Sequence, residues 1–211
     1  MMRNLAFAVL SSAAVCHAQT VPAPVAAPAS QPWQPMTGKE RMERYWKESF
    51  ASPGLYFAST GSAIGSQFGN DPPDWGKTGS GYAKRAASNF GRFSAQIAIH
   101  EAGAAALGLD PRYRNCECKG FFPRTGHAFK WTLVTRDNKG NIRPNAPVFA
   151  AAYGSGMIST LWYPDRYNPL TDGIRVGHQQ LALEVGVNVL REFGPELKRT
   201  LRHVTPHFLR R

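Results

Sequence analysis

Small residues recur at every fourth position between residues 81 and 109, and this spacing constrains the fold more than any other feature of the chain. Residues four apart lie above one another on a helix, so Ala83, Ala87, Gly91 and Ala95 form one row on a helix surface. Two further rows are made of Ile99, Gly103 and Leu107 and of Ala98, Ala102 and Ala106. Each helical glycine costs about 1 kcal/mol relative to alanine, whereas rows of small residues let two helix backbones approach closely. We therefore predict a helix here that packs tightly against a partner.

Further segments with helical patterns predict an all-α fold, a bundle of about five helices packed through Gly/Ala/Ser rows. Thr37 is a suitable N-cap for the first helix, and Gly194-Pro195 is expected to end the last. Residues 126–136 fit either a short helix or a strand, and we favour the helix, with a minor hairpin near 128–143 as the alternative. The expected long helices cover residues 39–50, 49–70, 81–109, 145–164 and 171–193.

The N-terminus has the pattern of a secretory signal peptide. Arg3 supplies the positive charge, residues 5–10 form the apolar stretch, and Cys16-His17-Ala18 has small residues where a signal peptidase reads the chain. The apolar run is too short to span a bilayer as a stable helix. We therefore expect cleavage after Ala18 and export. The alternative is lipid attachment at Cys16, which the preceding Val15 fits poorly.

The sequence divides into four predicted parts. These are a signal peptide over residues 1–18, a Pro/Ala-rich linker over 19–36, a helical domain over 37–195 and a basic tail over 196–211. The linker contains five prolines and no charged residue, which is typical of an extended spacer. The tail is suited to an anionic surface. The tail residues expected to make that contact are Lys198, Arg199, Arg202, Arg210 and Arg211.

The chain is strongly basic. Its formal net charge is +11, and the signal peptide contributes only Arg3 to it. Because an exported protein is separated from the cell's nucleic acid, we predict no nucleic-acid partner, and we expect anionic lipid or another envelope polyanion instead. The alternative is that the charge only maintains solubility. The small-residue helix faces also admit a homo-oligomer.

Two long segments, residues 49–70 and 145–164, contain no charged side chain. The second ends in Trp162-Tyr163 and is followed by charged residues, which is the arrangement of a membrane span with aromatic residues at the interface. It has few large apolar residues, however, so a buried helix of the bundle is an equal alternative. The sequence leaves both interpretations open.

His100-Glu101 begins like the motif of zinc proteases, whose second histidine must follow one helical turn later. That position is Ala104, so the motif is incomplete. We favour a structural role in which His100 or Glu101 pairs with an arginine. The arginines considered for this pairing are Arg85, Arg92 and Arg112.

Cys116 and Cys118 are the two cysteines that remain after the predicted cleavage. In an oxidising compartment they can form a disulfide within a small ring. Metal binding is the alternative, because thiolates bind zinc or copper(I), but it requires further ligands, for which only His100 and His127 are plausible. We predict the disulfide, and no metal or cofactor.

Polar residues at four-residue spacing form a stripe on the last expected helix: Gln180, Glu184, Asn188 and Glu192. If the stripe is buried, it could bind a cation or a polar head group. If it is exposed, it is the solvated face of an amphipathic helix. We favour the exposed stripe, which is the commoner arrangement.

Several short motifs occur in a characteristic order along the chain. They are Gly81-Tyr82 with Arg85, Asp110-Pro111-Arg112-Tyr113, Thr135-Arg136-Asp137 with Gly140, Tyr163-Pro164, and Glu192-Phe193. In this order they resemble a family of exported bacterial envelope proteins that are helical and rich in glycine and alanine. The resemblance covers residues 50–200 and implies an envelope location. The family has no established activity, so the resemblance transfers no catalytic residue.

These features together predict an exported envelope protein that is not an enzyme and associates with a membrane through its uncharged helices and basic tail. The alternative is a soluble periplasmic enzyme or small-ligand-binding protein with a polar site between helices. The candidate residues for such a site are His100, Glu101, His127, Glu184 and Asn188.

Overall fold

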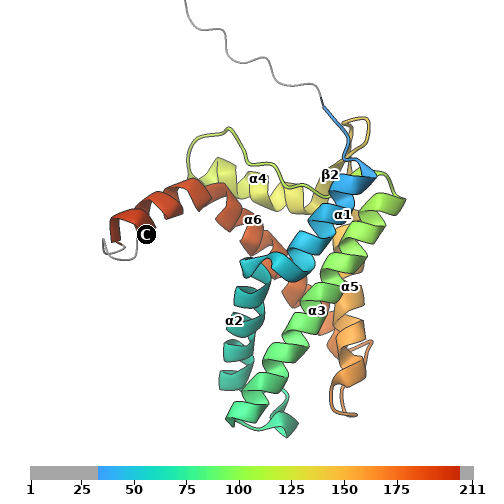
Figure 1. Ribbon diagram of the computed structural model, residues 1–211, viewed down its shortest axis with the longest axis vertical. Helices are drawn as coiled ribbons and strands as arrows, with labels where there is room; N and C mark the ends of the chain where they lie inside the picture. The colour runs from blue at the N-terminus through green and yellow to red at the C-terminus, as the bar shows by residue number, and fades with distance from the viewer. Residues whose placement is uncertain (1–32, 205–211) are drawn as a thin grey trace, which may run out of the picture. The chain divides into compact units, whose positions relative to one another are not determined.

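A computed structural model describes residues 33–204 of the chain, with side chains up to residue 200. The predicted signal peptide, Arg210 and Arg211 lie outside the described residues. The described part is mostly helical with one small antiparallel sheet, which confirms the predicted helical class (Figure 1).

The helices are α1 (Gly38–Trp46), α2 (Pro53–Gly69), α3 (Gly79–Ala106), α4 (Phe121–Leu133), α5 (Ala146–Ser159) and α6 (Asp172–Val204). The strands are β1 (Leu109–Asp110), β2 (Val134–Asp137) and β3 (Ile142–Pro144), and a short π-helical segment, η1 (Lys47–Ala51), follows α1.

α1 starts at the residue that the sequence suggests, and two further helices have a proline in their first turn. Thr37 caps α1, because its Oγ1 accepts from the backbone N–H of Glu40 at 3.3 Å while the Glu40 carboxylate accepts from the backbone N–H of Thr37 at 2.7 Å. Pro53 and Pro147 lie in the first turns of α2 and α5. A proline is tolerated there because the first N–H groups of a helix have no partner within the helix.

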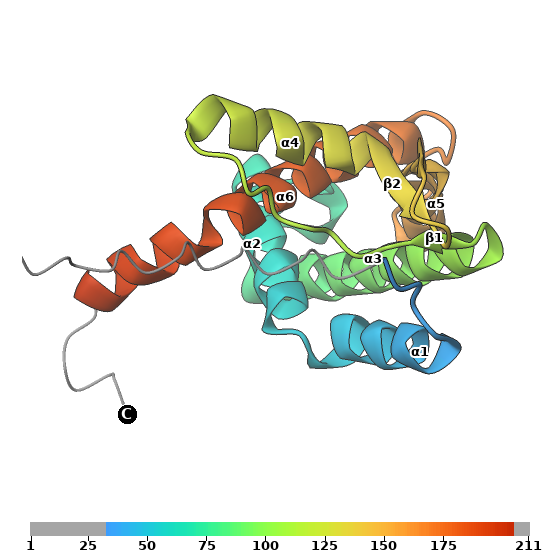
Figure 2. The same ribbon diagram turned by 90° about the horizontal axis from the view of Figure 1, so that it is seen from above.

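Helices α3, α5 and α6 form the centre of the fold. α3 and α5 run side by side (Figure 1). α5 packs on α6 through an approach that only glycine allows. A Cβ atom on Gly156 would overlap the carbonyl oxygen of Gly173, and one on Gly173 would lie 2.8 Å from the Cα of Met157. Figure 2 shows α4 over α6 on one side of α3, with α1 on the other side.

The uncharged segment 145–164 forms α5 and a short 3₁₀ turn, Thr160–Trp162. α5 packs against both α3 and α6, and half of its residues are buried. Its buried residues are Pro147, Val148, Ala151, Ala152, Ser155, Gly156 and Ser159. None of the helices within residues 33–204 combines the length and the apolar content that crossing a bilayer requires.

The last helix does not end at Gly194-Pro195, as the sequence suggested, but continues to Val204. A proline inside a helix cannot donate to the carbonyl one turn earlier, which for Pro195 is the carbonyl of Arg191. The side chain of Asn115 replaces the missing donor, because its Nδ2 donates to that oxygen at 3.0 Å. A partner from another part of the chain therefore allows α6 to continue past the proline.

The region 126–136 is divided between a helix and a hairpin. α4 ends at Leu133, and β2 then pairs with β3 so that Thr135 lies opposite Arg143. The expectation of a helix alone was therefore incomplete, and the minor hairpin near 128–143 is present over residues 134–144. β3 has only three residues, which is too few to show the alternation by which a strand is recognised in a sequence.

Arg85 organises the end of the fold at which α2 turns into α3. Its side chain is 1% exposed, and its guanidinium donates to the carbonyl oxygens of Asp71 at 3.0 Å, Pro72 at 2.6 Å and Gly76 at 2.7 Å. Gly81 lies against the same loop, where a Cβ atom would overlap the Gly76 carbonyl. These two residues therefore fix a turn and lie away from the polar cleft described below.

We predict that Gly156→Ala destabilises the protein, because the added methyl group forces α5 and α6 apart. Overpacking of this kind costs about 1–3 kcal/mol in the free energy of unfolding, which urea unfolding measures. Gly186→Ala is the matched control, since Gly186 is also helical and has no atom within 4 Å of an added Cβ. The control should be neutral or slightly stabilising. Equal stability of the two variants would contradict a close α5–α6 approach.

Candidate functional site

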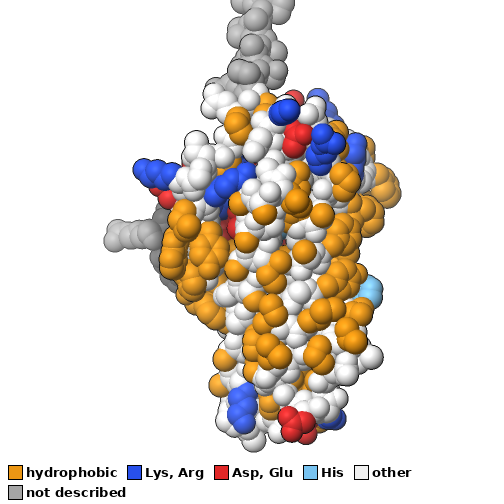
Figure 3. All heavy atoms as spheres, turned by 90° about the vertical axis from the view of Figure 1, so that its right-hand side faces the viewer, with side chains coloured by type: hydrophobic (Ala, Val, Ile, Leu, Met, Phe, Trp, Pro, Cys, Tyr) orange, Lys and Arg blue, Asp and Glu red, His pale blue; other side chains and the backbone are white. Residues whose placement is uncertain are grey.

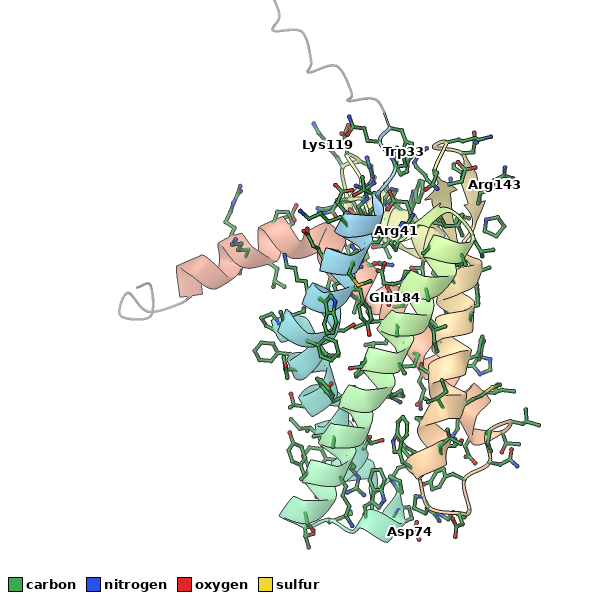
Figure 4. All side chains as sticks on the ribbon, turned by 45° about the vertical axis from the view of Figure 1, so that its right-hand side comes forward. Trp33, Arg41, Asp74, Lys119, Arg143 and Glu184 are labelled. Atoms are coloured by element: carbon green, nitrogen blue, oxygen red, sulfur yellow. A yellow bond between two sulfur atoms is a disulfide. The ribbon has the colours of Figure 1, made fainter. Side chains whose placement is uncertain are left out.

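A cleft of about 270 Å³ lies between α2 and α6, and residues of α1, η1, α3 and α5 complete its lining. It is present because α2 packs on α3, while α6 packs on α4 and α5. Leu55, Phe93 and Val148 form apolar walls. Figure 4 places Glu184 well inside the length of the bundle, with Arg41 toward one end and Asp74 at the other. The ionisable residues that line the cleft are Arg44, Glu48, His100, Glu101, Glu184 and Arg191.

Glu101 of α3 is the most buried carboxylate of the cleft, with 7% of its side chain exposed. Arg44 reaches it from α1 and donates from Nε to Glu101 Oε1 at 2.8 Å, while Arg44 Nη2 lies 2.9 Å from Glu48 Oε1. The other oxygen, Glu101 Oε2, is buried and has no hydrogen-bond partner among the described residues. A buried carboxylate oxygen without a donor is unfavourable, so it marks a position at which a donor from outside the chain would bind.

Burial moves two other groups of the cleft toward their uncharged forms. It raises the pKa of Glu48, although the Arg44 guanidinium acts in the opposite direction. It also lowers the pKa of His100, and this effect outweighs the Glu184 carboxylate, which favours the imidazolium. The positive charges of Arg44 and Arg191 add to the lowering. His100 is therefore a neutral hydrogen-bonding group in the folded protein near neutral pH.

The prediction that the polar stripe of α6 is solvated is wrong. Gln180 is 2% exposed, Asn188 is 3% exposed and Glu192 is completely buried. Gln180 Nε2 donates to Gln96 Oε1 at 2.5 Å, and Asn188 Nδ2 donates to Thr132 Oγ1 at 2.9 Å. Because α6 has α5 on one side and α4 on another, its polar face turns into the protein.

Glu192 lies beneath the segment 110–118, which links β1 to α4 and is called the strap below. The Tyr113 hydroxyl and the backbone N–H of Cys116 donate to Glu192 Oε1 at 2.5 and 2.9 Å, and His127 Nδ1 lies 2.9 Å from the same oxygen. Burial alone would raise the pKa of Glu192, but these donors outweigh it, so the pKa is lowered. Burial and the neighbouring carboxylate together raise the pKa of the Tyr113 hydroxyl.

The two cysteines lie in the strap and are joined by a disulfide, with 5.1 Å between their Cα atoms. The backbone N–H of Cys116 binds Glu192, so the disulfide-bonded turn is held against α6. Within residues 33–204, no cluster of three or more His, Cys, Asp or Glu side chains is placed to hold a metal ion. The disulfide is therefore part of the strap, which Glu192 holds against α6.

Three of the five predicted ligand residues, His100, Glu101 and Glu184, come together in the cleft. Asn188 lines a smaller hollow of about 30 Å³ that also includes His100 and Glu184. His127 lies apart from the cleft, under the strap. The five candidate residues are therefore divided among the cleft, the small hollow and the region under the strap.

The sequence did not identify Arg44 and Glu48 as members of the cleft. Glu101 pairs with Arg44, which lies 57 residues away in the sequence, so no short motif could have linked the two. The basic face of the first helix was the only signal, and it is also what a solvated face looks like. The arginines that we expected to bind His100 or Glu101 have other partners: Arg85 binds a loop, Arg92 binds Asn89, and Arg112 binds Asp110.

Of the predicted anionic-surface residues, Lys198 and Arg199 are exposed on the C-terminal part of α6. Arg202 lies on the same helix, outside the range of described side chains, and Arg210 and Arg211 lie outside the described residues altogether. The structure therefore places two of the five basic side chains on an accessible surface.

No family model matches the chain, and comparison with curated proteins and with solved structures finds no match either. The geometry of the cleft and of the strap is thus the basis for a functional interpretation. The cleft combines a volume of about 270 Å³ with the unpaired carboxylate oxygen and with the groups whose pKa values burial shifts. These are the features expected of a binding site.

We predict that the His100→Gln variant loses less free energy of unfolding than the wild type when the pH is lowered. His100 has an ordinary pKa of 6.5 that is lowered in the folded protein, so below pH 6.5 the unfolded chain binds the proton first. Folding stability is then lost as the pH falls from 6.5 through the lowered value. Urea unfolding at pH 7.5 and at pH 5.5 measures the effect. Comparison with the wild type cancels the contribution of Glu48, whose pKa is shifted the other way.

The matched control is His178→Gln, because His178 is exposed on α6. It should leave the wild-type dependence on pH unchanged. If His100→Gln loses as much stability between the two pH values as the wild type does, His100 does not sit in the environment described above.

Proposed function

We propose that this chain is an exported envelope protein that binds a small polar ligand in the cleft between α2 and α6. The observation that carries the proposal is Glu101 Oε2, a buried carboxylate oxygen without a donor in a cleft of about 270 Å³. Buried polar atoms are nearly always paired, so an unpaired one on a side chain that lines a cleft is best explained by a ligand donor. A volume of this size suits a molecule of metabolite size.

The charges of the cleft indicate which donor the ligand carries. Three carboxylates line it, on Glu48, Glu101 and Glu184, against two guanidiniums, on Arg44 and Arg191. A ligand with an ammonium group complements this excess of carboxylates and can donate to Glu101 Oε2. The apolar walls formed by Leu55 and its neighbours would cover the hydrocarbon part of such a molecule.

The rows of small residues support this proposal because we infer that they set the width of the cleft. An added Cβ atom would meet the Pro147 side chain at 3.3 Å from Gly103, and the Ile99 side chain at 3.1 Å from Gly154. α3 and α5 are thereby held at close distance. The space that is left open then lies between α2 and α6, and residues of both α3 and α5 line it.

We predict that Glu101→Gln weakens binding of small primary amines by about tenfold, because an amide replaces the carboxylate that pairs with the ammonium group. The probes are ethanolamine, putrescine and glucosamine, and calorimetry and thermal unfolding measure binding. Glu43→Gln is the control, since Glu43 is largely exposed on α1. The proposal is wrong if none of the three amines binds or if both variants bind as the wild type does.

A second candidate function, association with a membrane surface, is favoured by the exposed apolar side chains of α2. This helix has no charged residue, and Phe57 is 76% and Phe68 81% exposed. Figure 3 shows a further uncharged region, over α3 and α5, with charged side chains gathered toward its two ends. Exposed aromatic side chains on an uncharged helix suit the interface of a bilayer. This proposal agrees with the function expected from the sequence.

We predict that the double variant Phe57→Ser/Phe68→Ser lowers the bound fraction of the protein severalfold in sedimentation with phosphatidylglycerol vesicles, because it removes the apolar anchors. The control is Leu161→Ser/Leu170→Ser, since both leucines are equally exposed but lie outside α2. A wild-type protein that stays in the supernatant, or an equal loss in both double variants, contradicts membrane association through α2.

A further inference from the structure

A second hollow, of about 260 Å³, lies on the other side of the strap from the cleft. It is bounded by residue 33, by the strap, and by residues of α4 and β2. Three arginines surround the Trp33 ring, with guanidinium carbons 4.5 Å (Arg114), 5.7 Å (Arg136) and 5.9 Å (Arg112) from the ring centroid. Figure 4 places Trp33 at the same end of the molecule as Lys119 and Arg143, where basic side chains gather. We call this hollow the arginine pocket.

The three guanidiniums are engaged to different degrees. Arg112 is committed to Asp110, because its Nε lies 2.9 Å from both carboxylate oxygens. Arg136 gives one donor to the Gly140 carbonyl at 2.7 Å. Arg114 makes no hydrogen bond or ion pair with the described residues, and its guanidinium lies over the ring of Trp33. Most donors of Arg114 and Arg136 are therefore available to a ligand.

A fourth donor lies in the same place. The indole Nε1 of Trp33 is buried and has no hydrogen-bond partner among the described residues. Asp110 offsets the charge of Arg112, and Glu117 offsets one of the other two arginines, so the side chains around the pocket leave one positive charge in excess. The pocket thus combines excess positive charge with hydrogen-bond donors from several side chains.

We propose that the arginine pocket binds a phosphate group. Several guanidinium forks and an indole N–H match the tetrahedrally arranged oxygens of a phosphate, which accepts from many directions. A planar carboxylate would be served by one fork and would leave the indole donor unpaired. The phosphate could belong to a free phosphorylated molecule or to a phospholipid head group, because both present the same oxygens. This inference does not depend on the function proposed for the cleft.

The test is a titration of the full chain with inorganic phosphate at constant ionic strength, followed by the indole N–H signals in nuclear magnetic resonance. Trp33→Phe identifies the Trp33 signal and keeps a ring for the arginines to stack on. We expect phosphate to shift this signal at millimolar concentration. Arg114→Gln should weaken binding about tenfold, the value expected for losing one charge-assisted contact. Arg143→Gln is the control, because Arg143 is 60% exposed at the same end and pairs with Asp137.

Two further arms distinguish the source of the phosphate. Glycerol 3-phosphate represents a free phosphorylated molecule, and phosphatidylglycerol vesicles represent a lipid head group. Competition of glycerol 3-phosphate with inorganic phosphate assigns a free ligand, while binding to vesicles that Arg114→Gln weakens assigns a head group. No shift of the Trp33 signal in any arm, or an equal loss in Arg114→Gln and Arg143→Gln, overturns the proposal. Glu101→Gln should bind phosphate as the wild type does, so failure here is separate from failure at the cleft.

Discussion

The arrangement of the cleft and of the arginine pocket depends on the hydrogen bonds of the buried Glu192 carboxylate. Through them Glu192 holds Tyr113 and Cys116 of the strap and His127 of α4 against α6, at distances between 2.5 and 2.9 Å. Donors that satisfy a buried charge make it a strong restraint, because any rearrangement would leave that charge unpaired in a poorly solvated site. The fully buried apolar residues are mainly small, so directional polar contacts hold elements that a larger apolar core would otherwise hold.

The cleft follows from how closely different pairs of helices can approach. α5 and α6 meet through Gly156 and Gly173, and this contact fixes the first half of α6 against α5. α4 and the strap then hold the second half of α6 through Glu192. α2 packs on α3 instead, so α6 does not lie against α2 along the length of α2. A cleft therefore remains between α2 and α6, and it is lined by polar residues because the polar stripe of α6 faces inward.

The local features of this fold could be read from the sequence, because neighbouring residues encode them. Thr37 caps a helix, Pro53 and Pro147 begin two more, and the rows of small residues mark α3. The features that could not be predicted depend on partners that are distant in the sequence. The spacing of Gln180 shows that it shares a face with Glu192, but only the position of α4 and α5 shows that this face is covered. The pairing of Arg44 with Glu101 could not be predicted for the same reason, because the two residues lie 57 positions apart in the sequence.

The strap separates two hollows of opposite charge. Its Pro111 lines the cleft, which has an excess of carboxylates, while Arg112 and Arg114 line the arginine pocket, which has an excess of guanidiniums. The small hollow between them shares His100 with the cleft and Arg112 with the pocket. A strap that moved toward either side would change the shape of both. Tyr113 lines the small hollow, and its hydrogen bond to Glu192 holds the strap in place between the other two.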